Sequence, residues 1–241
     1  VLMLLVGAVF VYTPGDLIVN NILGMDINSN VIWIVYACIL AYYVVATIFP
    51  IDAIIGRVYP IFGAFLIISA VGIFIGILRG GGAYLHPITE GAFLSKHPTG
   101  QSFIPVFFIT VACGIISGFH ATQATLISRT VKSEKEGVKT FYNMMIVEGF
   151  IAMCWAAGAM VLFNTGHALD TPATIMVGDI ATTFMGKVGG MLAIVGVIVL
   201  PITSGDTAFR SLRLMLSEQY NINQSTKGKR VRLSIAIFVP A

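Results

Sequence analysis

Polar side chains interrupt a long apolar stretch in the middle of the chain. The run Cys113–Gln123 reads CGIISGFHATQ, and the chain carries no Asp, Glu, Lys or Arg between His97 and Ser128. Glycine loosens a helix, and polar side chains inside a membrane mark functional pathways more often than lipid-facing surfaces. We therefore expect a discontinuous helix whose freed backbone groups and side chains line a cavity, as in many transporters. The residues expected to contact a substrate are Ser117, Gly118, Phe119, His120, Thr122 and Gln123.

A structural alternative explains the same residues without a ligand. Gly114 and Gly118 are four positions apart, so a continuous helix could pack closely against a neighbour along this small-residue face. Gly72 and Gly76 have the same spacing, and we interpret that pair as packing. His120 could then bond to a backbone carbonyl. Under the first interpretation, the amino-terminal end of a half-helix at residues 121–123 would favour an anionic group.

A second polar group follows Pro201, which lacks an amide proton and is expected to bend its helix. Thr203, Ser204 and Asp206 come next, and their hydroxyl and carboxylate oxygens suit a proton or a small cation, with Na⁺ expected at Thr203 and Ser204. The alternative is an ordinary polar helix end in which Asp206 faces Arg210 at the i+4 position.

Glu148 lies six residues inside another apolar block, and an intramembrane carboxylate is a functional hypothesis by default. We expect it to couple protons or substrate, the alternative being a solvated position near the interface. His86, Glu90 and His97 show no metal-ligand spacing and are interpreted as loop residues. Because no phosphate-binding loop or catalytic triad occurs, we expect no enzyme activity, no metal apart from Na⁺ and no cofactor beyond a coupling ion.

The elements that carry these residues are predicted to be membrane-spanning helices. The chain is 57% hydrophobic and 10% charged, whereas soluble domains carry roughly 25% charged residues. The apolar residues form blocks of about 20 residues, which is the length that crosses a ~30 Å hydrocarbon core. These blocks are Val31–Phe49, Val58–Leu78, Phe103–Phe119, Tyr142–Phe163 and Val188–Thr203, with partial blocks at Val1–Thr13 and Leu233–Ala241. We expect a fragment of a longer multi-pass protein, completed by further helices on both sides.

The basic residues predict the orientation of these helices. One alternate set of loops holds Arg79, Lys96 and Lys187, and the other set holds the remaining eleven of the 14 Lys and Arg residues. Basic residues favour the cytoplasmic side of short loops. The loops 50–57, 120–141 and 204–232 are therefore expected in the cytoplasm, in a chain that crosses the cell membrane several times.

Three stretches resemble the carbon starvation protein A (CstA) family. They are the run Cys113–Gln123, with its Ser-Gly-Phe-His-Ala-Thr-Gln string, the stretch Ile48–Ala64, and Pro201–Arg213. The resemblance extends over essentially the whole chain. One departure is that Ala124-Thr125 follows Gln123, where family members often carry Ser-Pro.

The resemblance implies a LeuT-like inverted-repeat helix bundle of the APC superfamily, with residues 1–241 forming part of one transmembrane domain. It implies spans at about 1–13, 31–49, 58–78, 103–131, 142–163, 188–216 and 233–241, the fourth broken and the sixth bent. Thr203–Thr207 resembles the cation-site pattern of related sodium-coupled transporters, with Gly205 in place of alanine.

The function implied by this resemblance is secondary active import of peptides or pyruvate during carbon starvation, by ion-coupled alternating access. The alternatives are a membrane-embedded starvation sensor and a non-transporting membrane subunit. The expected partners are the small-molecule substrate and the lipid bilayer, with no nucleic acid.

Overall fold

The computed structural model describes residues 2–48, 52–85, 100–115, 124, 127–128, 131–166, 172–223 and 227–238. Within these ranges the regular structure is entirely helical, joined by turns and short irregular segments. The expected all-α architecture is confirmed for this part of the chain. The LeuT-like inverted repeat stays a prediction.

The first helix is longer than its apolar block suggests. Helix α1 (Leu2–Leu17) continues without interruption into the π-helical turn η1 (Ile18–Ile22), although the predicted partial block ends at Thr13. Pro14 removes one backbone hydrogen bond, but Leu17 and Val19 beyond it are completely buried. Burial of these side chains against the neighbouring helices explains why the helix continues beyond the proline.

Of the next three helices, α2 (Val31–Ile48) and α4 (Phe103–Ile115) begin where predicted, whereas α3 (Asp52–Gly76) begins six residues before the predicted Val58, within the expected loop 50–57. Helix α3 continues through η2 (Ile77–Gly81) and η3 (Gly82–Tyr84). The start of α4 is that of the predicted fourth span. The expected break of that span, and all six expected substrate-contacting residues, lie outside the described residues.

The fifth span begins earlier than expected. The short helix α6 (Glu134–Gly137), the π-helical segment η5 (Val138–Asn143) and α7 (Met144–Asn164) form one continuous helical run. Its first turn carries Glu134 and Glu136. This polar start extends the helix into the expected loop 120–141.

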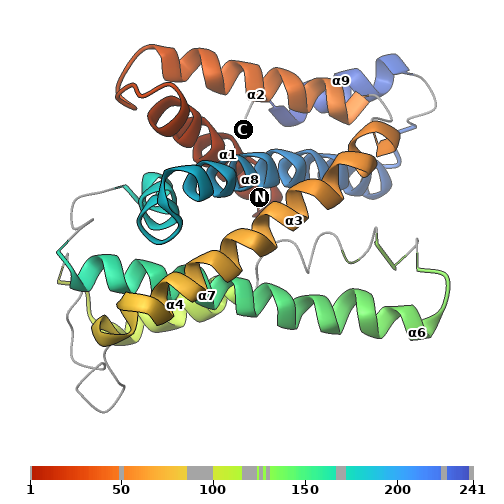
Figure 1. Cartoon of the computed structure of the whole chain (residues 1–241). Helices are drawn as coiled ribbons and strands as arrows, with labels where there is room; N and C mark the ends of the chain where they lie inside the picture. The colour runs from red at the N-terminus through yellow and green to blue at the C-terminus, as the bar shows by residue number, and fades with distance from the viewer. Residues whose placement is uncertain are drawn as a thin grey trace.

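Helix α8 (Ala173–Gln219) departs furthest from expectation. Its first thirteen residues occupy part of the segment Asn164–Lys187, for which a loop was predicted. Gly186 then adopts φ 70° and ψ −178°, a conformation that favours glycine, and the helix changes direction there. Figure 1 shows this change of direction. Pro201 lies within the second part of α8, so the marked change of direction is at Gly186, and the expected bend at Pro201 stays a prediction.

Helix α8 is the central element, packing against α1, α2 and α3. A Cβ atom added to Gly72 or Gly76 would lie 2.8 Å from Met185 or 2.9 Å from Phe184, so α3 approaches the first part of α8 closely. The packing interpretation of these two glycines is therefore confirmed. The last helix, α9 (Lys227–Phe238), lies against α2 and α8.

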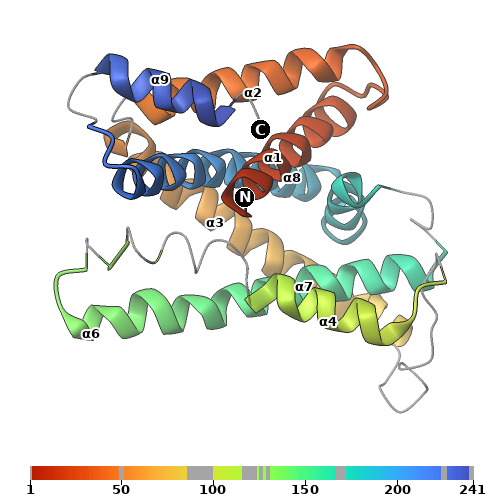
Figure 2. The same ribbon diagram turned by 180° about the vertical axis from the view of Figure 1, so that it is seen from behind.

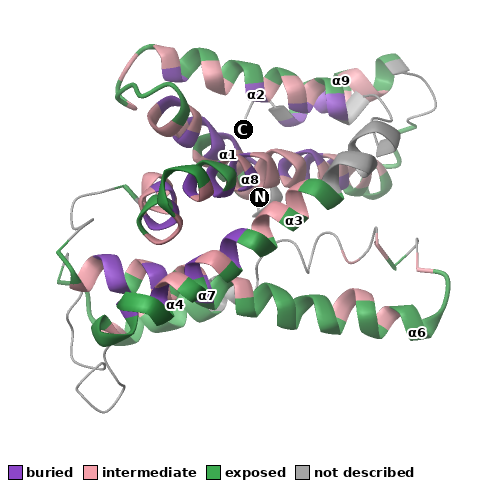
Figure 3. Ribbon diagram, viewed as in Figure 1, coloured by how far each residue is buried: buried purple, intermediate pink, exposed green. Residues whose placement is uncertain are grey.

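Many large apolar side chains remain on the surface. Trp33, Leu78, Phe108 and Val188 are 69%, 68%, 63% and 80% exposed. Figure 3 shows buried residues concentrated around α1 and α8, and mostly exposed residues along η5 and the start of α7. An apolar surface of this extent belongs against lipid. In the part of the chain that the structure describes, four helical runs are long and apolar enough to cross a membrane, namely Leu4–Ile22, Pro60–Tyr84, Glu134–Asn164 and Thr174–Gln219.

The helix ends fall into two groups at opposite ends of the molecule. The carboxyl ends of η1, η3 and α7 lie at the left of Figure 1, whereas those of α2 and α8 and the start of α6 lie at the right. The view from behind shows the same grouping. This arrangement matches the two alternating sets of loops that the basic residues distinguish.

Candidate functional site

A cavity of about 590 Å³ lies between α1, the run η5–α7 and the second part of α8. Most of its wall is apolar, but a carboxylate and two hydroxyl groups also line it. Its lining includes Phe10, Ala124, Ile127, Thr140, Phe141, Met144, Glu148, Leu200, Pro201 and Ser204.

Glu148 and Ser204 therefore border one cavity from two different helices. At 1.5 Å per residue, Glu148 lies about 24 Å along the helix from Asn164, within the length that crosses a ~30 Å hydrocarbon core. The helix α7 presents this carboxylate to the cavity, and Ser204 follows Pro201 on α8. The Glu148 side chain is exposed, and together with Ser204 it gives the largely apolar cavity a polar part of its wall.

The cavity also lies beside the end of the segment predicted to contact substrate. Ala124 directly follows Gln123, and both Ala124 and Ile127 line the cavity. The expected contacts of Ser117, Gly118, Phe119, His120, Thr122 and Gln123 lie outside the described residues. The cavity is thus lined by residues that directly follow that segment in the sequence.

The continuous helix α8 separates Ser204 from Asp206. Residues two positions apart on an α-helix differ by about 200° around its axis. Ser204 lines the cavity, whereas Asp206 is buried, only 2% exposed, on the other side of the helix. The structure therefore does not gather these two side chains at one ion site.

Asp206 instead pairs with Arg210. Arg210 Nη2 lies 3.7 Å from Asp206 Oδ2 and donates a hydrogen bond of 3.1 Å to the carbonyl oxygen of Ala46. Ala46 lies in the last turn of α2, whose final carbonyls have no partner within the helix. The ion pair predicted as the structural alternative is thus present, and it fastens α8 to the end of α2.

The hydroxyl of Thr203 is also committed within α8. It donates to the carbonyl oxygen of Leu200 at 2.9 Å, and the carbonyl of Thr203 accepts from the Thr207 hydroxyl at 3.2 Å. Such bonds to the preceding turn are common for threonine in helices. The donated hydrogen bond leaves the lone pairs of the Thr203 hydroxyl oxygen available to a cation, so a sodium ion at Thr203 and Ser204 stays a prediction. Among the described residues, no three His, Cys, Asp or Glu side chains form a metal-binding group.

Tyr43 is a buried polar residue that was not among the candidate site residues of the sequence. It is fully buried, and its hydroxyl lies 2.8 Å from the carbonyl oxygen of Phe10 and 3.3 Å from that of Pro201. A Cβ atom on Gly205 would lie 2.4 Å from the same hydroxyl, so glycine is what allows α2 to approach α8 here. The sequence signals this contact only through a small residue, Gly205, that lies between the polar residues Ser204 and Asp206.

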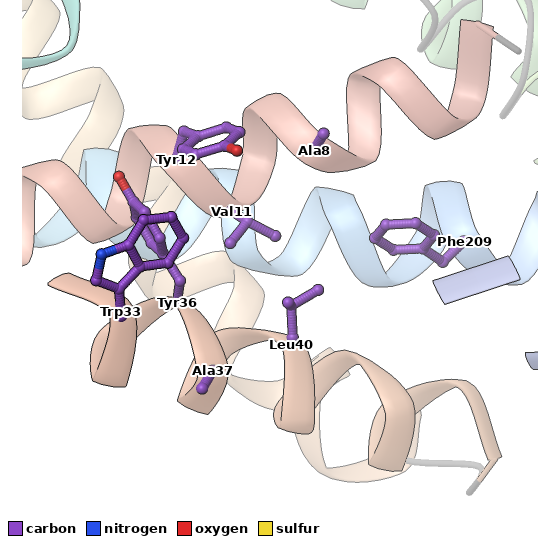
Figure 4. Close-up of a pocket in the computed structure, with 8 residues that line it drawn as sticks. All are labelled: Ala8, Val11, Tyr12, Trp33, Tyr36, Ala37, Leu40 and Phe209. Atoms are coloured by element: carbon purple, nitrogen blue, oxygen red, sulfur yellow. The ribbon is translucent and has the colours of Figure 1, made fainter. Parts of the chain in front are cut away.

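A second, smaller cavity of about 220 Å³ lies between α1, α2 and α8 (Figure 4). Its lining is almost entirely apolar and aromatic: Ala8, Val11, Tyr12, Trp33, Tyr36, Ala37, Leu40 and Phe209. The Tyr36 hydroxyl donates to Asp16 Oδ1 at 2.5 Å, which joins α1 to α2. Asp16 is a membrane-segment carboxylate that sequence reasoning missed, because a loop was expected there.

The comparisons with known proteins agree with the membrane-spanning helices of the structure. The family model described as "Carbon starvation protein CstA" matches residues 1–191. The residues Thr203–Asp206 lie beyond that matched range. No solved structure matches the chain.

Three relatives show how far the similarity extends. An "Uncharacterized membrane protein" of Haemophilus influenzae is 34% identical over 215 residues, covering 70% of this chain and 58% of the relative. The "Peptide transporter CstA" of Mycobacterium tuberculosis is 32% identical over 127 residues, covering 48% of this chain and 16% of the relative. The "Pyruvate/proton symporter BtsT" of Escherichia coli is 26% identical over 110 residues, covering 42% and 15%.

The chain thus spans 58% of the length of the first of these relatives and about one sixth of the two named transporters. The family match nevertheless covers well over half of this chain. Together with the apolar helices, it shows that the chain belongs to the carbon starvation protein CstA family of membrane proteins.

Proposed function

We propose that the full-length protein is a secondary active transporter of the cell membrane that imports peptides or pyruvate when carbon is scarce. The observation that carries this proposal is the cavity shared by Glu148 and Ser204, between helices that are long enough to cross a membrane. A structural subunit has no need of a carboxylate beside a hydroxyl in such a cavity.

The relatives support a transporter of small molecules. Two of them are named as a peptide transporter and a pyruvate/proton symporter, and neither name describes an enzyme. Because the chain covers only a small part of each, the choice between peptide and pyruvate is part of the proposal. The inverted-repeat architecture, with Ser117–Gln123 at the substrate, belongs to it as well.

A proton is the proposed coupling ion, and Glu148 is its proposed carrier. Glu148 and Ser204 border the same cavity, whereas Thr203 and Asp206 are engaged in bonds within α8 and towards α2. Protonation of Glu148 would remove a charge from a largely apolar cavity, and the energetic cost of an intramembrane charge is what couples such a step to conformational change.

The proposed orientation places the loops 50–57, 120–141 and 204–232 in the cytoplasm, following the excess of basic residues there. Glu148 and Ser204 then lie in the cytoplasmic half of the membrane. For the cavity to open towards the outside of the cell, the helices would have to rearrange, as alternating access requires.

The test is uptake by the full-length protein in energised membrane vesicles. Labelled pyruvate and a labelled dipeptide are compared with and without a proton gradient, and again with a sodium gradient. Saturable uptake of either substrate driven by the proton gradient alone supports the proposal. Uptake driven only by sodium would contradict the role of Glu148, and uptake of neither substrate would favour the sensor.

A further inference from the structure

The smaller cavity, between α1, α2 and α8, has the lining of a site for an apolar ligand. Its volume is about 220 Å³, and Figure 4 shows the aliphatic and aromatic side chains that line it. The Tyr36 hydroxyl, one of the few polar groups of the lining, already donates to Asp16. An apolar cavity of about 150 Å³ stays dry and takes up an apolar molecule such as benzene. This larger cavity is therefore suited to an apolar ligand of greater size.

Two glycines of α1 build the cavity by letting aromatic rings lie directly on that helix. A Cβ atom on Gly15 would overlap the ring of Tyr36, and one on Gly7 would overlap the ring of Phe209. The ring of Trp33 stands nearly at right angles to that of Tyr36, with the two centroids 6.0 Å apart. These contacts hold the rings at the two ends of the cavity in place, so its shape is part of the packing of the three helices.

The cavity runs inwards from the membrane surface along α2. Trp33 lies in the first turn of α2, and Leu40 lies seven residues later, which is about 10 Å along the helix. The exposed polar residues Asp26 and Asn28 precede that first turn. Because tryptophan prefers the boundary between membrane and water, the Trp33 end belongs at the level of the lipid headgroups. Figure 4 shows Phe209 at the opposite end, which then lies in the hydrocarbon region.

The side of the cavity formed by exposed residues faces lipid. Tyr12, Trp33 and Ala37 line the cavity and are exposed, and so are the neighbouring residues Val9 and Ile34. The cavity is thus continuous with the apolar surface of α1 and α2, which belongs against lipid. A transmembrane helix is about 10–12 Å wide with its side chains, so it could cover this cavity but not fill it. A single acyl chain is narrow enough to enter.

We propose that the cavity binds one acyl chain of a phospholipid. The ester end of the chain lies beside Trp33, and the methylene groups run past Ala37 and Leu40 towards Phe209. Figure 4 shows the indole nitrogen of Trp33 turned away from the Phe209 end, so its N–H is placed to donate to an oxygen of the ester or the phosphate. This inference depends neither on the transported substrate nor on the coupling ion.

The test measures the fluorescence of Trp33 in the purified full-length protein, taken as the difference between the wild type and Trp33→Phe. The probe is phosphatidylcholine with a brominated acyl chain, because bromine quenches tryptophan on contact. The detergent has a rigid, ring-shaped apolar group, so that no detergent alkyl chain competes for the cavity. Ala37→Leu fills part of the cavity, and the matched control is Ala64→Leu, which enlarges an exposed alanine on α3.

The wild type and Ala64→Leu should show saturable quenching of Trp33, and bromines near the ester should quench more than bromines at the chain end. Ala37→Leu should need about tenfold more lipid, because the added carbon atoms displace methylene groups from the cavity. Saturation and position dependence are measured on the unsubstituted protein, so they test the proposal even if a variant folds poorly.

Two results would overturn the proposal. Quenching that rises without saturation, equally in the wild type, Ala37→Leu and Ala64→Leu, would show only general solvation by lipid. Absence of Trp33 quenching in the wild type would show that another part of the full-length protein covers the cavity.

Discussion

The hydroxyl of Tyr43 lies 2.8 Å from the carbonyl oxygen of Phe10, and Phe10 lines the larger cavity. Pro201, whose carbonyl oxygen lies 3.3 Å from the same hydroxyl, lines it as well. One buried side chain on α2 therefore connects the two helices that form one side of the cavity. The shape of the cavity therefore depends on the hydrogen bonds of Tyr43, a residue that does not itself line the cavity.

Replacing Tyr43 with phenylalanine tests this connection. The ring remains, but the hydroxyl that satisfies the Phe10 and Pro201 carbonyls is lost, so the variant should be less stable by about 1 kcal/mol. The measurement is the melting temperature of the detergent-solubilised full-length protein. Tyr42→Phe, at the half-buried neighbouring position, is the control. Equal melting temperatures for Tyr43→Phe and the wild type would show that the hydroxyl bonds contribute nothing.

Adding a methyl group at Gly205 tests the close approach of α2 and α8. The new Cβ would lie 2.4 Å from the Tyr43 hydroxyl oxygen and 2.5 Å from Cζ, so Gly205→Ala should destabilise the protein by about 1–3 kcal/mol. Gly63→Ala is the matched control, because a Cβ on that helical glycine meets nothing within 4 Å. Alanine favours helix there, so the control should be neutral or stabilising. The amount of folded protein in the membrane distinguishes the two, and equal amounts would contradict the packing described here.

The pair formed by Asp206 and Arg210 should be structural. Asp206→Asn leaves Arg210 without its carboxylate partner and should lower stability by about 1–3 kcal/mol. Adding Arg210→Gln should recover part of this loss, because the uncompensated charge is removed too. Uptake per folded molecule should keep its dependence on ions in the single variant. A changed sodium dependence would instead return Asp206 to an ion-coupling role.

His120 is the sequence-derived candidate with the clearest transport prediction. His120→Ala should sharply reduce proton-driven uptake by the full-length protein, because the imidazole is proposed to contact substrate. His97→Ala is the control, since His97 is interpreted as a loop residue. The rate of uptake per molecule in vesicles is the measurement, and wild-type rates in His120→Ala would count against the proposed substrate site.

Apolar runs predicted most of the helices correctly, because a membrane-spanning helix must be apolar along its length. They failed where tertiary packing holds a polar or proline-containing segment in a helix. Pro14 lies inside the first helix because Leu17 and Val19 are buried beyond it. The segment from Ala173 to Gly186 carries Asp179 and two adjacent threonines, and these polar residues left it outside the predicted apolar blocks.

The sequence predicted individual residues of the candidate site but not how they are arranged. Glu148 and Ser204 were identified because polar residues are costly in a membrane, but nothing in their spacing showed that they border one cavity. Thr203, Ser204 and Asp206 were grouped because they are adjacent in sequence. The regular helix through Pro201 points Ser204 and Asp206 to different sides, and only the path of the backbone could reveal this.

The most direct measurement for the account is a comparison of Glu148→Gln with wild type in two assays on the same vesicles. Glu134→Gln, which removes an exposed carboxylate from α6, is the control. The first assay is accumulation of labelled substrate driven by a proton gradient, and the second is exchange of labelled for unlabelled substrate without a gradient. The account predicts that Glu148→Gln loses accumulation and retains exchange, because the carboxylate carries the proton and not the substrate. Accumulation at the wild-type level in Glu148→Gln would contradict it.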